Sequence, residues 1–228
     1  MKIKLLLFVS LFSTLAFSQR LPITAPNYPL INEEIHNIHS KYYYPTLFQR
    51  FMANDTTLNV EEYRYLYYGY TFQKEYRPYW HSQQDSILKK YSETEQLDIS
   101  DCDSIIRYAT LSLSAFPFDL HKFDLLSYAY RRKGNIGLSK LYMRKNEQIL
   151  EAIMSSGNGR SVLTAWHVIS VDHEYEILYL LGLFAENQTL VGDNCDYIFV
   201  SKNRYNVKGL FFDVKRLFEL QPQRIGAK

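Results

Sequence analysis

The 228-residue sequence predicts an α+β fold, in which a multi-helix part is followed by a small, mainly antiparallel sheet with one or two helices. Two observations predict this class. Residues 60–72 carry apolar side chains at helical spacing, and after the turn at 155–159 the chain becomes rich in β-branched and aromatic residues. We therefore divide the chain into a signal peptide (1–18), a helical part (19–156) and a small α+β part packed on it (157–228).

Residues 60–72, with the sequence VEEYRYLYYGYTF, are predicted to form the central helix. Apolar residues spaced three and four apart make one face of this helix: Tyr63, Leu66, Tyr67 and Tyr70. A second apolar line follows another face: Tyr65, Tyr68 and Phe72. A helix that is aromatic on two faces needs neighbours on both sides, because a single packed layer would leave one line in water. Asn59 or Thr57 is expected to cap the first turn.

The remaining helices of this part are predicted from apolar spacing and from residues that begin or end helices. Pro45 predicts a break near Tyr44 within the helical stretch 32–52. After an aromatic loop, helices are expected over residues 82–92, 102–115, 120–133 and 136–155. Asp119 is positioned to begin the third of these, and Gly134 to turn the chain after it.

The α+β part is predicted to contain three strands. Residues 162–171 (VLTAWHVISV) are rich in β-branched side chains, and a helix is expected to follow over 172–183. Residues 195–201 and 208–214 are predicted to pair as a hairpin. A short helix over 215–220 is expected to close the chain.

The stretch from residue 104 to residue 153 alternates helices with two turn motifs, Phe116-Pro117-Phe118-Asp119 and Gly134-Asn135. Between the motifs lie the residues expected at helix contacts: Leu126, Tyr128, Ala129 and Tyr130. Tetratricopeptide repeats have a proline between units and a Gly-Asn or Gly-Asp turn inside a unit. The stretch therefore resembles about one and a half tetratricopeptide-type helical hairpins. This resemblance implies a surface that binds peptides in a concave groove.

A second resemblance is carried by five phrases spread over the chain: YYP at 43–45, DTTL at 55–58, EYRYLYYGY at 62–70, AWHVI at 165–169 and HEY at 173–175. These phrases resemble an uncharacterised domain-of-unknown-function family of secreted Bacteroidetes proteins. The resemblance implies export and one shared architecture. It supplies no activity that can be transferred to this chain.

Residues 1–18 are predicted to be a secretory signal peptide. Lys2 and Lys4 form the basic start, an apolar run follows over 5–17, and residues 16–18 have the small-residue pattern of a cleavage site. We therefore expect an exported protein, either periplasmic or extracellular. No later segment is apolar enough to cross a membrane.

The charge of the predicted mature chain argues against two classes of binding partner, and its two cysteines leave a disulfide open. Removing residues 1–18 lowers the 26 basic residues by two lysines and removes no acid, so 24 basic residues remain beside 24 acidic ones. A mature chain of zero net charge gives no electrostatic reason to expect binding to nucleic acid or to an anionic membrane. Cys102 and Cys195 both lie in the exported part, where a disulfide can persist, but the sequence does not show whether they pair.

His167, His173 and Glu174 are the candidate catalytic residues. A histidine near carboxylates can act as a general base or a metal ligand, and Asp172 lies beside this group. The structural alternative is that Asp172 caps the following helix and Glu174 lies in its first turn. No HExxH or HxH spacing is present, so the structural alternative is favoured, and no metal site or cofactor is predicted.

Two further polar groups are candidate sites. Glu33, His36 and His39 share one side of a predicted helix, as either a surface metal site or, more simply, a solvated face. The loop 156–161 (SGNGRS) lacks the lysine and the spacing of a phosphate loop and is expected to be a hinge. Arg160 in this loop is a candidate anion-binding residue.

An aromatic group is the last candidate binding site: Tyr65, Tyr68, Tyr76, Tyr79 and Trp80. Exposed rings of this kind stack on sugars or hold peptides. The alternative is that they pack between the helices, which the central position of residues 60–72 favours.

Together these observations favour a non-enzymatic exported protein that binds or scaffolds a protein or peptide partner through its helical part. One alternative is a small hydrolase or metal-dependent enzyme at His167, His173 and Glu174. The other is carbohydrate binding by the loop aromatics. The sequence contains no G-x-S-x-G motif that would indicate a serine nucleophile.

Overall fold

The computed structural model describes residues 23–79, 81–92, 94 and 97–219, and it confirms the α+β class. The first part contains α1 (Tyr28–His36), α2 (Tyr44–Met52), α3 (Val60–Tyr70), α4 (Asp85–Ser92), α5 (Ile99–Ala115), α6 (Leu120–Arg132) and α7 (Ile136–Met154). The second contains η1 (Val162–Thr164), β1 (Trp166–His167), α8 (Val171–Leu180), β2 (Ala185–Val191), β3 (Cys195–Val200), β4 (Gly209–Asp213) and α9 (Lys215–Glu219). Helices therefore come first and the sheet last, as predicted.

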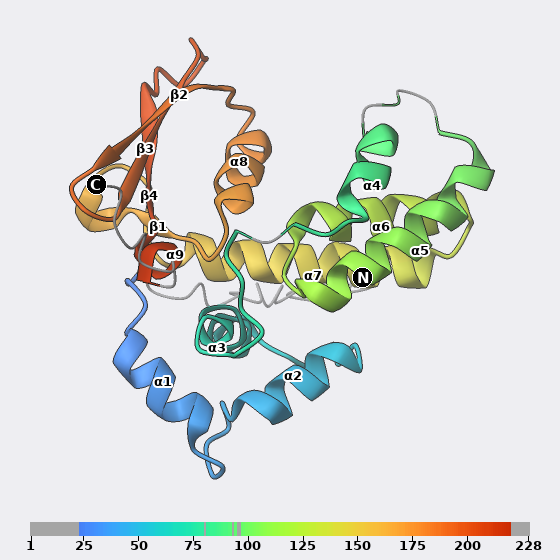
Figure 1. The fold of residues 1–228 in the computed structure, drawn as a ribbon, viewed down its shortest axis with the longest axis horizontal. Coiled ribbons are helices and arrows are strands. Elements are labelled where there is room, and N and C mark those ends of the chain that lie inside the picture. The colour runs from blue at the N-terminus through green and yellow to red at the C-terminus, as the bar shows by residue number, and fades with distance from the viewer. Residues whose placement is uncertain (1–22, 80, 93, 95–96, 220–228) are drawn as a thin grey trace, which may run out of the picture.

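Helix α3 is the centre of the helical part. It is seen end-on in Figure 1, with α7 on one side and α1 and α2 on the other, and it packs against all three. The side chains predicted to form its first apolar face are all buried: Tyr63, Leu66, Tyr67 and Tyr70. Tyr68 of the second line is buried as well. The prediction of a central helix with neighbours on both sides is confirmed.

The first turn of α3 is closed by a capping box. The backbone N–H of Glu62 donates to Asn59 Oδ1 over 3.0 Å, and the backbone N–H of Asn59 donates to Glu62 Oε2 over 2.9 Å. Two backbone donors that a helix start leaves without partners are thereby satisfied. At the other end, Gly69 lets α1 approach, since a Cβ there would lie 3.0 Å from Ile35 Cγ2.

The hydrophobic core joins the two parts of the chain. Its main cluster contains Ile35 of α1, Leu66 of α3, Ile149 of α7 and Ile198 of β3. A second cluster lies where α4, α5 and α6 meet. In Figure 1, α5, α6 and α7 lie together at the right, and α8 lies between them and the sheet.

The sheet has the strand order β1-β4-β3-β2. Strands β3 and β4 pair antiparallel with Cys195 opposite Asp213, which confirms the predicted hairpin. Strand β2 is antiparallel to β3, and β1 is parallel to β4 with Trp166 opposite Phe212.

One strand prediction was too long, and one strand was not predicted. Only Trp166 and His167 of the predicted strand 162–171 belong to the sheet, because η1 precedes them and Ser170 already caps α8 by accepting from the Asp172 N–H. Strand β2 was missed because its sequence, AENQTLV, is polar and exposed on both faces, so it shows no alternation. The helix predicted over 172–183 starts one residue earlier and ends at Leu180.

Both cysteines are buried free thiols. Cys102 lies in the core between α4, α5 and α6, whereas Cys195 lies on β3. Among the residues that the structure describes, no helix has both the length and the hydropathy needed to cross a bilayer. The predicted signal peptide lies outside the described residues.

Candidate functional site

His173 is a fully partnered core residue. It is 1% exposed, and its Nε2 lies 3.0 Å from the carbonyl oxygen of Phe118. A carbonyl only accepts, so Nε2 carries the proton and Nδ1 accepts from the hydroxyl of Tyr67 over 2.7 Å. Burial lowers the pKa of His173, which keeps the ring neutral. The Tyr67 oxygen in turn accepts from the Ile169 N–H over 3.2 Å.

Glu174, the next residue, has the opposite situation. It is fully buried, and both of its carboxyl oxygens lack a hydrogen-bond partner among the described residues. Burial, with a smaller contribution from the nearby Asp196 and Asp172, raises the pKa of Glu174 to about 9. The side chain is therefore a neutral acid at pH 7. Burial of a carboxyl group without a hydrogen-bond partner lowers the stability of the folded state.

His167 lies apart from these two residues. Its Nδ1 is 3.5 Å from Asp213 Oδ1 on β4 and makes no hydrogen bond with a described residue. Burial lowers the pKa of His167, against the attraction of Asp213. The three candidate catalytic residues thus contact different neighbours and do not line a common cavity. Within the described ranges, no three histidine, cysteine or carboxylate side chains are arranged to hold a metal ion.

The predicted aromatic group is divided between core and surface. Tyr68 and Tyr76 are buried, and their hydroxyls donate to the carbonyl oxygens of His167 and Ile169, respectively. Tyr65 stacks on Tyr42 with 3.7 Å between ring centroids. Tyr79 is exposed, whereas Trp80 lies outside the described residues. The burial of Tyr68 and Tyr76 favours core packing over contact with a partner for these two.

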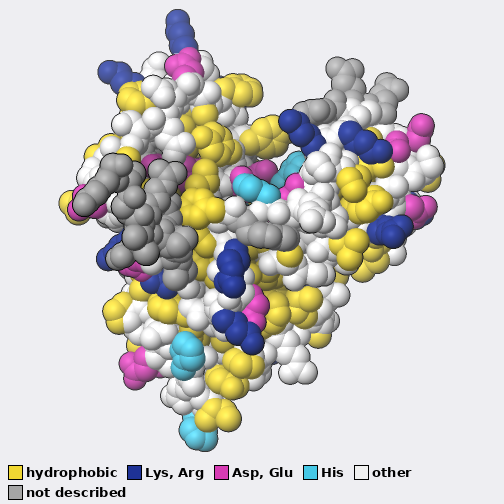
Figure 2. Space-filling model, viewed as in Figure 1, with side chains coloured by type: hydrophobic (Ala, Val, Ile, Leu, Met, Phe, Trp, Pro, Cys, Tyr) yellow, Lys and Arg dark blue, Asp and Glu magenta, His cyan; other side chains and the backbone are white. Residues whose placement is uncertain are grey.

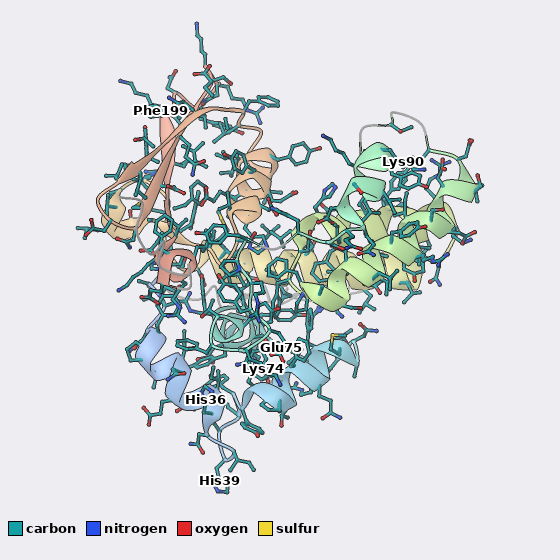
Figure 3. All side chains as sticks on the ribbon, in the orientation of Figure 1. His36, His39, Lys74, Glu75, Lys90 and Phe199 are labelled. Carbon is teal, nitrogen blue, oxygen red and sulfur yellow. The ribbon has the colours of Figure 1, made fainter. Side chains whose placement is uncertain are left out.

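The remaining predicted site residues lie on the surface. Figure 3 shows His36 and His39 at the outer end of α1, where His36 Nδ1 is 2.7 Å from the carbonyl oxygen of Asn32. Glu33 is exposed on the same helix. Arg160 is exposed on the loop between α7 and η1 and lines an open groove beside the C-terminal end of α8.

A cavity of the helical part lies between α2, the end of α3 and the corner that joins α5 to α6. Its volume is about 660 Å³, within the range of small-molecule sites. Most of its wall is aromatic side chains and prolines: Tyr44, Pro45, Phe48, Tyr70, Phe116 and Pro117. We call it the aromatic groove.

Tyr44 brings a polar group to the wall of the aromatic groove. Its side chain is 6% exposed, and its hydroxyl oxygen has no hydrogen-bond partner among the described residues. Burial raises the pKa of this hydroxyl well above its ordinary value, and the nearby Tyr70 and Glu75 contribute to the shift. Tyr70 and Glu75 also line the groove. A buried hydroxyl without a partner costs about 1–3 kcal/mol of stability.

The rim of the aromatic groove is formed by the loop that follows α3. Gln73 donates from its side-chain nitrogen to the carbonyl oxygen of Gly69 over 3.1 Å, which ties the loop to the helix. Arg77 donates to the carbonyl oxygen of Tyr76 over 2.9 Å. Figure 3 shows Glu75 near α3 and α2. Apolar walls with an acid, a base and an amide at the rim suit an occupant that has an apolar body and polar ends.

A polar cleft separates α8 from α4 and α6. Figure 2 shows histidine and acidic side chains in this hollow. Its volume is about 330 Å³. Lys122 lies at its base, with its Nζ 3.0 Å from Asp85 Oδ1 and 3.2 Å from Asp119 Oδ2. His121 Nδ1 lies 3.6 Å from Glu176 Oε1 across the cleft.

Burial weakens the ionic character of the His121–Glu176 contact. Burial, with repulsion from Asp124 and Asp119, raises the pKa of Glu176 to about 7. Burial lowers the pKa of His121. Both shifts favour the uncharged forms. A carboxyl group with a pKa near neutrality is the kind that transfers protons in enzymes.

Neither cavity was predicted from the sequence. The aromatic groove combines residues 44–48, 70–77 and 114–117, and the polar cleft combines residues 81–85, 116–122 and 172–176. The only local signals were proline and aromatic residues at helix ends, such as Pro45 and Pro117, which predict turns equally well.

Comparison with known proteins identifies the family of the chain. No curated protein and no solved structure matches it. The model of a domain of unknown function, DUF4919, matches residues 29–222, which includes α2 to α9 and both cavities. The chain therefore belongs to the DUF4919 family.

Proposed function

We propose that this protein is an exported, non-enzymatic binding protein that holds an organic ligand or a short peptide in the aromatic groove. The observation that carries the proposal is the cavity of about 660 Å³, whose wall is mostly aromatic side chains and prolines. The apolar start of the chain supports export. The resemblance of residues 104–153 to tetratricopeptide hairpins supports a binding role for the helical part.

The groove has the properties that binding requires. Aromatic walls supply apolar area at a low cost in side-chain entropy, because each ring has only two rotatable bonds. Phe48 and Phe116 are only partly buried, so their rings remain accessible to an occupant. The side chains of Gln73 and Glu75 supply polar contacts that orient the occupant.

A substitution that fills the groove tests the proposal. Ser114 is exposed at the rim, so Ser114→Trp would occupy the groove without disturbing the core. A library of small organic fragments and tripeptides is screened by ligand-observed NMR. We expect ligands that bind the wild-type protein and Ser100→Trp, an exposed site at the far end of α5, and that no longer bind Ser114→Trp. An absence of ligands that Ser114→Trp displaces would overturn the proposal.

A second candidate function is acid–base catalysis in the polar cleft. The observation that favours it is the His121–Glu176 contact, where burial raises the pKa of Glu176 to about 7 and lowers the pKa of His121. Glu176 would act as the general acid. A panel of ester, amide and glycoside substrates tests this candidate. Turnover that Glu176→Gln abolishes would favour it over the binding proposal, whereas turnover that survives Glu176→Gln excludes it.

A further inference from the structure

An open groove lies beside the C-terminal end of α8, on the α+β part and away from the aromatic groove. Its volume is about 750 Å³. It is bounded by the end of α8, by the loop after α7 and by the connection between β3 and β4, and we call it the α8 groove. Trp166, Leu183 and Leu210 lie beneath it as buried core residues. Ile23, on the segment before α1, also lines the groove.

Large apolar side chains surround the α8 groove and remain in contact with water. Tyr179, Leu180 and Tyr205 expose 76%, 58% and 55% of their surfaces. Single exposed apolar residues are ordinary, but several around one concave surface mark an interaction site. Tyrosine is also among the residues enriched in protein interfaces.

The charge of the α8 groove is entirely of one sign. Arg160 and Arg204 line it, and none of its lining residues is acidic. Neither arginine forms an ion pair with a residue that the structure describes. Arg204 donates to the Tyr205 hydroxyl over 2.6 Å and lies 4.8 Å from the centroid of that ring, so the cation is held at the edge of the apolar surface. The groove is therefore complementary to a carboxylate next to apolar groups.

The two ends of the chain are unsuitable occupants. Residues 19–22 contain Arg20 and no acid, and residues 220–228 contain Arg224 and Lys228 and no acid. Both segments would bring positive charge to Arg160 and Arg204. A fatty acid fits less well than a peptide, because one side of its alkyl chain would remain in water in an open groove. A peptide instead presents its polar backbone to the solvent side.

We propose that the α8 groove binds a peptide segment of a partner protein in which Asp or Glu is flanked by large apolar side chains. The carboxylate pairs with Arg160 and Arg204, and the apolar side chains pack between Tyr179, Leu180 and Tyr205. Arginine suits this role because its planar guanidinium binds a carboxylate through two parallel hydrogen bonds. This site is separate from the aromatic groove and does not depend on the function proposed for it.

Selection from a random twelve-residue peptide display library against residues 19–228 tests the proposal. We expect the selected peptides to combine Asp or Glu with Phe, Tyr, Trp or Leu. Fluorescence anisotropy with the synthesised peptides should show an affinity at least tenfold lower for the double variant Arg160→Glu/Arg204→Glu. A matched double variant with the same change of charge, Arg107→Glu/Arg131→Glu on exposed positions of α5 and α6, should bind within twofold of the wild type.

Tyr179→Ala provides a second test that does not depend on the charge reversal. This side chain is mostly in solvent, so its truncation should leave the melting temperature unchanged and weaken peptide binding about fivefold or more. Selected peptides without an acid, binding that survives Arg160→Glu/Arg204→Glu, or no selected peptides at all would overturn the proposal. Displacement of the peptide by micromolar dodecanoate would assign the groove to an amphiphile. Self-association that is lost in the double variant would assign the groove to a second copy of the chain. Either result would also overturn the proposal.

Discussion

The two buried faces of α8 differ in whether their polar side chains have hydrogen-bond partners. On the face toward α3, His173 makes hydrogen bonds with Tyr67 and the Phe118 carbonyl, and every polar atom of its ring is satisfied. On the face toward the sheet, the adjacent Glu174 has neither carboxyl oxygen paired with a described residue. The two residues are equally buried, so burial alone does not decide the energetic consequence of a polar side chain. The partner atoms on the opposing element decide it.

His173 and Glu174 are predicted to make the free energy of unfolding depend on pH in opposite directions. The pKa of His173 is lowered in the folded state, so below pH 6.5 the unfolded chain binds a proton that the folded state does not, and the free energy of unfolding falls with falling pH. The pKa of Glu174 is raised from 4.5 to about 9, so between these values the unfolded chain releases a proton that the folded state keeps. The free energy of unfolding therefore falls with rising pH in that window.

The largest expected effect is that of His173→Leu. It leaves the Tyr67 hydroxyl and the Phe118 carbonyl without their partners in the core, which should lower the free energy of unfolding by about 4 kcal/mol at pH 7. Urea denaturation followed by circular dichroism measures this change. A loss below about 1 kcal/mol would show that these hydrogen bonds contribute little.

The substitution Glu174→Gln should have the opposite sign. An amide does not ionise, so the free energy of unfolding should rise by about 3 kcal/mol at pH 7 and be nearly unchanged at pH 4. Thermal denaturation from pH 4 to pH 9 measures the slope that the substitution removes. Glu33→Gln, on an exposed position of α1, is the control and should leave the slope in place. An unchanged slope in Glu174→Gln would mean that Glu174 has a partner in solution.

The substitution Tyr67→Phe tests the hydrogen bonds on the face of α8 toward α3. It removes the hydroxyl that joins His173 to the Ile169 N–H, and it should cost about 2 kcal/mol. Because Tyr67 and His173 share a hydrogen bond, the double variant with His173→Leu should lose less stability than the sum of the single variants. Strict additivity in urea denaturation would show that the shared hydrogen bond is unimportant.

The smallest expected effect is that of Tyr76→Phe. Its hydroxyl donates to the Ile169 carbonyl over 2.8 Å, and removing this one bond should cost about 1 kcal/mol. Tyr79→Phe, at an exposed position in the same loop, should change stability by less than about 0.5 kcal/mol. A second control is Tyr179→Phe, at a position of α8 that is 76% exposed, which should also change stability by less than about 0.5 kcal/mol. An effect of Tyr179→Phe equal to that of Tyr76→Phe would contradict the buried position of Tyr76.

Local sequence signals predicted the elements that depend on local interactions. The spacing of Tyr63, Leu66, Tyr67 and Tyr70 predicted α3, and Asn59 with Glu62 forms the cap that begins it. The hairpin of β3 and β4 also followed from its two apolar runs and the turn between them. Strand β2 depends instead on pairing with β3, so its polar sequence contained no signal.

The sequence by itself therefore determined the order of helices and strands and the two-sided burial of the central helix, because both follow from side-chain periodicity along a short segment. Only the tertiary structure decided which polar residues are satisfied and where the cavities lie. Tyr67 and His173 are 106 positions apart, and the aromatic groove combines three separate segments. Contacts between distant segments depend on how whole elements pack, which no local pattern of residues specifies.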